Sequence, residues 1–104
     1  MVTLIKKMTV LGDINEFLAA KDPVTAHLAA TEGHVGNRTL RNLGQPGVFV
    51  EIAHWNDLEQ YEAAVGSEEF NALAAALSPL VTTEAGLYEV VPVGARLDTA
   101  GTYA

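Results

Sequence analysis

The sequence has 104 residues, a hydrophobic fraction of 49% and a net charge of −7 at pH 7. This length predicts one domain, and the composition is typical of a globular protein rather than a disordered one. The acidic balance excludes nucleic acid and anionic membranes as partners, because binding to either requires clustered Lys and Arg.

The chain contains no cysteine, which excludes disulfides and thiolate chemistry. The first ten residues do not resemble a signal peptide, and no apolar run approaches the roughly 20 residues of a membrane-spanning helix. We therefore expect a cytoplasmic protein.

The N-terminal third predicts a strand followed by a helix. Residues 2–10 alternate, with the more apolar set, which includes Lys6, facing the core. Asp13 and Glu16 form a capping box that begins the helix, and apolar residues at spacings of three and four continue to Leu28. Proline removes a helical hydrogen bond, so a kink or restart is expected at Pro23.

Two strands and a tight turn follow. Residues 34–42 predict the second strand, residues 44–47 a turn rich in Gly and Pro, and residues 48–55 the third strand. Alternation in the third strand places Phe49, Glu51 and Trp55 on one face. In the second strand only one of Asn37 and Arg38 can face the helices.

The C-terminal half predicts two helices and a last strand. Asp57 and Ser67 are N-caps, and each begins an apolar stripe, the first with Tyr61 and the second with Phe70. Residues 86–93 predict the fourth strand, so the domain is expected to span residues 1–93 and a loose tail residues 94–104. The order β-α-β-β-α-β predicts an α+β, ferredoxin-like fold with a four-stranded antiparallel sheet and helices on one face.

The element order and four segments carry a family resemblance: EGHVGNRTLRN, QPGVFVEIAHW, WNDLEQY and GSEEFNALAAAL. Together they resemble the antibiotic biosynthesis monooxygenase family over residues 2–91. The resemblance implies a homodimeric α/β barrel, with a substrate pocket between each sheet and its own helices. It also implies oxidation of a phenolic polyketide intermediate or a quinol by molecular oxygen, without metal or flavin.

The resemblance also implies site residues. Trp55 matches the strand-end tryptophan of anthrone-oxidising members, and Tyr61 matches their pocket tyrosine. Glu51 stands where those members can have an asparagine, so this chain has a group that can accept a proton. Their active-site arginine has no counterpart in the alanine-rich residues 72–76, and residues 71–77 lack the histidine that haem-degrading relatives need.

Each candidate also has a structural interpretation. Glu51 is either the general base or the partner of a cation such as Lys6 or Arg38, and Trp55 is either a pocket wall or a core aromatic. We predict that Glu51, Trp55 and Tyr61 are catalytic. The predicted substrate contacts are His34, Asn37, Arg38, Phe49 and Phe70. The histidine spacing does not favour a metal site, and the glycines form no phosphate-binding loop.

Two functions remain open. The first is a cofactor-independent monooxygenase that acts on an aromatic phenol, anthrone or quinol. The second is a non-oxygenase on the same fold, namely a cyclase, an isomerase or a small-molecule binding protein.

Overall fold

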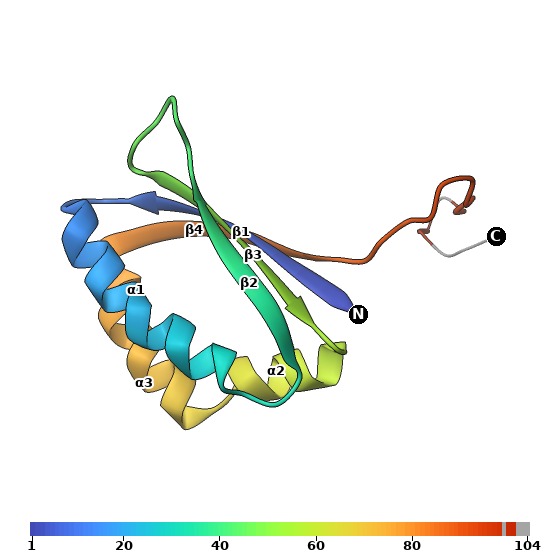
Figure 1. The fold of residues 1–104 in the computed structure, drawn as a ribbon, viewed down its shortest axis with the longest axis horizontal. Coiled ribbons are helices and arrows are strands. Elements are labelled where there is room, and N and C mark those ends of the chain that lie inside the picture. Colours follow the sequence, from blue (N-terminus) through green and yellow to red (C-terminus); the bar gives the residue numbers. More distant parts are fainter. Residues whose placement is uncertain (99, 102–104) are drawn as a thin grey trace.

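The computed structural model describes residues 1–98, 100 and 101. An open four-stranded antiparallel sheet, in the order β2-β3-β1-β4, carries three α-helices on one face (Figure 1). The elements are β1 (Val2–Val10), α1 (Ile14–Ala29), β2 (His34–Arg41), β3 (Val48–Trp55), α2 (Leu58–Val65), α3 (Glu68–Leu77), a 3₁₀ turn (Ser78–Leu80) and β4 (Val81–Tyr88). The predicted ferredoxin-like fold is confirmed.

Each helix begins at the predicted cap. The side chains of Asp13, Asp57 and Ser67 accept a hydrogen bond from the backbone N–H three residues later. These bonds satisfy donors that the first helical turn leaves free. The caps therefore set where the three helices begin.

The expected restart of the helix at Pro23 is wrong. Helix α1 continues from Ile14 to Ala29 with Pro23 inside it. Pro23 is exposed, while Phe17 and Val24 are buried. Burial before and after the proline stabilises the helix against the lost hydrogen bond.

The predicted bounds of the fourth strand are also wrong, because β4 spans Val81–Tyr88 rather than residues 86–93. The strand pairs with β1 from Val10 opposite Val81 to Thr3 opposite Tyr88. Beyond Tyr88 almost no length of β1 remains to pair with, and the chain leaves the body of the domain (Figure 1). Of the predicted tail, residues 99 and 102–104 lie outside the described residues.

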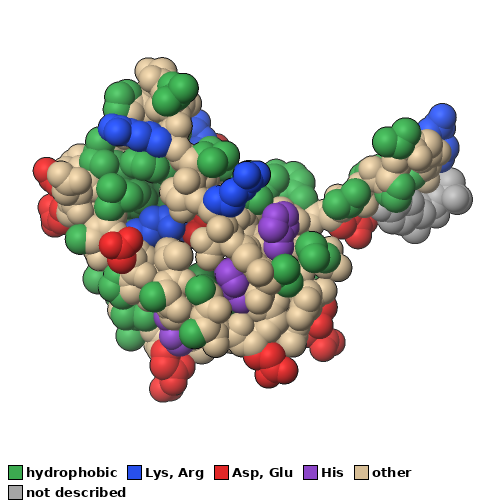
Figure 2. Space-filling view, viewed as in Figure 1, with side chains coloured by type: hydrophobic (Ala, Val, Ile, Leu, Met, Phe, Trp, Pro, Cys, Tyr) green, Lys and Arg blue, Asp and Glu red, His purple; other side chains and the backbone are tan. Residues whose placement is uncertain are grey.

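The core consists of two apolar clusters between the sheet and the helices. One is built on Met8, Phe17 and Phe49, the other on Leu4, Ala53 and Trp55. Acidic side chains lie mainly on the helical side of the molecule, and Lys and Arg lie mainly over the strands (Figure 2). Within the described part of the chain, no helix is both long enough and apolar enough to cross a membrane.

Candidate active site

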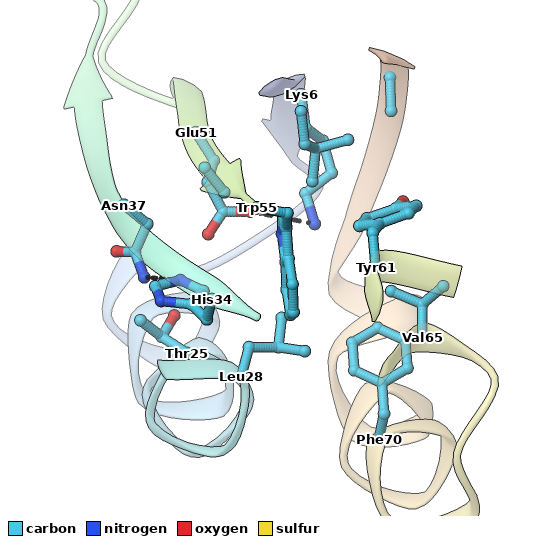
Figure 3. A pocket seen from close by; sticks show the side chains of 13 residues that line it. Lys6, Thr25, Leu28, His34, Asn37, Glu51, Trp55, Tyr61, Val65 and Phe70 are labelled. Carbon is cyan, nitrogen blue, oxygen red and sulfur yellow. Dashed lines mark hydrogen bonds and ion pairs between the residues drawn. The ribbon is translucent and has the colours of Figure 1, made fainter. Parts of the chain in front are cut away.

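A cavity of about 80 Å³ lies between the inner face of the sheet and all three helices (Figure 3). Its walls are mostly apolar, with a few polar groups that converge on it. The lining residues are Leu4, Lys6, Thr25, Leu28, His34, Asn37, Glu51, Ala53, Trp55, Tyr61, Val65, Phe70 and Ala85. An apolar pocket with a few convergent polar groups is the usual form of a small-molecule site.

An extra residue in β2 brings His34 and Asn37 to the same side of the sheet. Strict alternation would place them on opposite faces, but the register shifts between His34 and Gly36, so that His34 pairs with Trp55 and Asn37 with Ala53. Nδ2 of Asn37 then donates a hydrogen bond to Nε2 of His34, 3.1 Å away. This bond orients the imidazole ring along the cavity wall (Figure 3).

Three aromatic rings stand side by side in the cavity wall. The rings of His34 and Trp55 meet edge to face with centroids 5.2 Å apart, and those of Trp55 and Tyr61 do so at 5.8 Å. Trp55 is almost fully buried. Edge-to-face packing fixes the ring planes, so the row forms a rigid wall against which a flat ligand can lie.

A buried ion cluster forms the polar end of the cavity. Glu51 lies opposite Lys6 in the β1–β3 register, with Nζ of Lys6 3.4 Å from Oε2 of Glu51. From α1, Nζ of Lys21 approaches Oε1 of Glu51 to 3.3 Å and donates to Oγ1 of Thr25 at 2.9 Å. Glu51 and Lys21 are both buried.

Lys21 is a functional candidate that sequence reasoning missed. The inner stripe of α1 runs through Phe17 and Val24, and Lys21 occupies the position between them at the same spacing. A lysine at an inner position of an apolar stripe is the signal that could have identified it, because a buried ammonium group needs a partner.

Tyr61 brings a phenol group to this pocket. Burial raises the pKa of its phenol above 10.0, and the negative charges of Glu51 and Glu62 raise it further. The phenol therefore stays protonated at neutral pH and can donate its proton in a hydrogen bond to a ligand oxygen.

Comparisons with known proteins agree with this geometry. Residues 1–76 match the family model of the antibiotic biosynthesis monooxygenases. The chain belongs to this family. The curated deoxynogalonate monooxygenase of Streptomyces nogalater is 32% identical over 104 residues, which cover 97% of this chain and 86% of that protein.

Solved structures give the same result. SnoaB, a cofactor-independent oxygenase from Streptomyces nogalater, superposes with a TM-score of 0.84 at 31% identity, over 88% of this chain and 93% of that one. A conserved protein from Methanosarcina mazei, at 19% identity and a TM-score of 0.77 over 84% of this chain and 89% of that one, shares the fold. The predicted family and the predicted monooxygenase class of enzyme are confirmed.

Six of the eight residues predicted for the site of this family member line the cavity: Glu51, Trp55, Tyr61, His34, Asn37 and Phe70. Arg38 does not, because it pairs with Ile52 on the outer face of the sheet. Phe49 is on the inner face but packs against Phe17, with ring centroids 5.4 Å apart, inside the apolar cluster next to the site. The roles of the six lining residues stay predictions.

Metal binding has no geometric support in the described residues. No three His, Asp or Glu side chains among residues 1–98, 100 and 101 lie close enough together to hold a metal ion. His34 is held by Asn37, and His54 lies near Thr3, with Nδ1 2.9 Å from Oγ1.

Proposed function

We propose that this protein is a cofactor-independent monooxygenase that oxidises an aromatic phenol, anthrone or quinol of polyketide type with molecular oxygen. The observation that carries the proposal is the pairing of a rigid row of aromatic rings, His34, Trp55 and Tyr61, with a buried carboxylate, Glu51, in one apolar cavity. The similarity to the deoxynogalonate monooxygenase and to the SnoaB structure of Streptomyces nogalater supports it.

Glu51 is the general base of the proposed reaction. A carboxylate has about four lone-pair positions, and among residues 1–98, 100 and 101 two ammonium groups approach this one, at 3.3 and 3.4 Å. Those distances exceed the roughly 2.7–2.9 Å of strong charge-assisted bonds, so lone-pair positions of the carboxylate remain available to a substrate C–H or O–H group. A substrate C–H or O–H next to an aromatic ring supplies the proton.

The substrate and O₂ provide the remaining chemistry. The substrate carbanion gives one electron to O₂, and the resulting radical and superoxide combine into a peroxide that takes the proton back from Glu51. Loss of the second C–H proton and of hydroxide then breaks the O–O bond. For an anthrone the balance is CH₂ + O₂ → C=O + H₂O, with Tyr61 donating a hydrogen bond to the developing oxyanion.

A multi-ring substrate needs more room than the cavity of about 80 Å³. Ligand pockets usually measure about 300–1,000 Å³. A neighbouring cavity of about 180 Å³ shares two lining residues with the first, Lys6 and Phe70. Rotation of the Phe70 ring about its side-chain bonds joins the two cavities into one elongated site.

The active form is a cytoplasmic homodimer. Val48, Val50 and Ile52 of β3 and Ile5 of β1 lie on the sheet face opposite the helices. Ile5 is 37% exposed in the single chain. An apolar sheet face of this kind is buried economically by a second copy.

Oxygen uptake tests the function. Chelator-treated protein is mixed with a panel of anthrones and quinols in ¹⁸O₂, and products are analysed by mass spectrometry. The proposal requires enzyme-dependent uptake with one labelled oxygen atom in the ketone. A product of unchanged mass without oxygen uptake would instead identify a cyclase or isomerase on this fold.

A further inference from the structure

We propose that the pocket binds an anionic group of its ligand, and that the ammonium group of Lys6 makes the contact. Lys6 and Lys21 each pair with Glu51, and no other ion pair reaches either lysine within residues 1–98, 100 and 101. Two positive charges therefore share one negative charge.

Burial makes this imbalance significant. The side chains of Lys21 and Glu51 are only 8% and 7% exposed, and that of Lys6 is 22% exposed. Water screens charges poorly at such depth, and a buried charge without a counter-ion is unfavourable. A ligand anion would supply the negative charge that the cluster lacks.

The position of Lys6 identifies it as the group that meets the ligand. Lys6 lines both the first cavity and the neighbouring one, whereas Lys21 lines neither. Lys21 is instead held from behind by Glu51 and Thr25. Lys21 is thus a positioning residue that occupies one oxygen of Glu51, which leaves the charge of Lys6 only partly neutralised.

Within the proposed function, on which this inference rests, the ligand is an aromatic compound with a carboxylate or an ionised phenol near one end. The rings would lie along the wall formed by Trp55 and Tyr61, and the anionic oxygen would meet Lys6. When Glu51 takes a proton from such a substrate, the negative charge moves onto the substrate and stays near the same lysines. The cluster therefore stabilises the anion that reacts with oxygen.

Calorimetric binding of two inert probes tests the inference. At neutral pH 2-naphthoate is an anion and 2-naphthamide is a neutral molecule of nearly the same shape, and neither can be oxygenated at a CH₂ group. We expect the full-length protein to bind naphthoate about 10- to 100-fold more tightly, as for a hydrogen bond between charged groups. Lys6→Met should remove this preference without weakening naphthamide binding, and Lys6→Arg should retain it.

Lys7→Met is the matched control, because Lys7 is the next residue of β1 and lies on the opposite face of the sheet. It removes the same charge and should leave the preference unchanged. Equal binding of both probes, binding of neither, or a preference that survives Lys6→Met would overturn the inference. The binding experiment and the oxygen assay can fail separately. Selective binding of the anion without oxygen uptake would refute only the oxygenase proposal. Oxygen uptake without selective binding of the anion would refute only the role of Lys6.

Discussion

The Nζ atom of Lys21 lies 3.3 Å from Oε1 of Glu51, across 30 residues of sequence and from a different layer of the fold. Both side chains are buried. Since Glu51 also pairs with Lys6, any change at Glu51 acts on the stability of the domain as well as on the proposed reaction.

Glu51→Gln should lower turnover by about 10²–10⁴-fold, since it removes the proposed base. It should also destabilise the domain by about 3–5 kcal/mol, because two ammonium groups lose their shared carboxylate. Oxygen uptake and urea unfolding measure the two effects. Near wild-type turnover would mean that the carboxylate is structural and that His34, water or the substrate itself takes the proton.

The double variant Glu51→Gln/Lys21→Met separates the two effects. It leaves one positive charge in the cluster, the same net charge as in the wild type. Stability should recover in large part while turnover stays low. If turnover recovered together with stability, the loss in Glu51→Gln would have come from misfolding.

Tyr61 should be harder to ionise than an ordinary tyrosine. Its pKa is raised above 10.0, so the folded state holds the phenol proton more tightly than the unfolded state does. The resulting stability is complete below pH 10 and is lost as the pH rises through the pKa of the folded state. In Tyr61→Phe, urea unfolding should show a smaller loss of stability above pH 10, and turnover should fall less than in Glu51→Gln. An unchanged alkaline loss of stability would contradict this.

Phe70→Ala should join the two cavities that Phe70 and Lys6 now separate. Calorimetry should show tighter binding of a three-ring carboxylate and little change for benzoate. Leu73→Ala is the control: Leu73 lies on the same helix and packs on the core but lines neither cavity. If Phe70→Ala and Leu73→Ala changed ligand binding equally, Phe70 would not be the residue that separates the two cavities.

The wild-type protein should have twice the mass of the 11.0 kDa chain in light scattering at micromolar concentration. Ile52→Lys places a charge on the apolar outer face and should give monomers. Leu11→Lys, in an exposed turn, should leave the dimer intact. A wild-type mass of one chain would refute the dimer.

Gly33→Ala should destabilise the domain by at least about 1–2 kcal/mol. Gly33 has a φ of 91°, which side chains other than glycine adopt at a cost. A Cβ there would also lie 2.5 Å from Oε1 of Gln60. Gly12→Ala, with open space around the added methyl group, should change the free energy of unfolding by less than about 0.5 kcal/mol. Equal values for the two variants would contradict this reasoning.

Most of the fold could be predicted because the alternation of the strands and the capping residues of the helices indicate the same order of elements. Alternation in β1 and β3 identified the inner faces correctly, including Lys6 and Glu51, since a strand with one buried face has a fixed register. The capping residues located the helix starts because their bonds reach only three residues.

The wrong or missing predictions concern features that depend on contacts between distant parts of the chain, which local sequence patterns do not show. Whether Pro23 breaks α1 depends on burial of Phe17 and Val24 against other elements. The end of β4 depends on the length of β1, next to which it lies in the sheet. Lys21 joins the site through a contact between layers, and the position of His34 depends on a bulge that strict alternation does not predict.

That bulge has a second consequence, for the solubility of the fold. Strand β2 is at the edge of the sheet, where unpaired backbone groups can recruit a strand from another molecule. The extra residue between His34 and Gly36 disturbs the regular spacing of those groups. The irregularity that turns His34 toward the cavity therefore also interrupts the first part of this edge, where a strand from another molecule would have to pair.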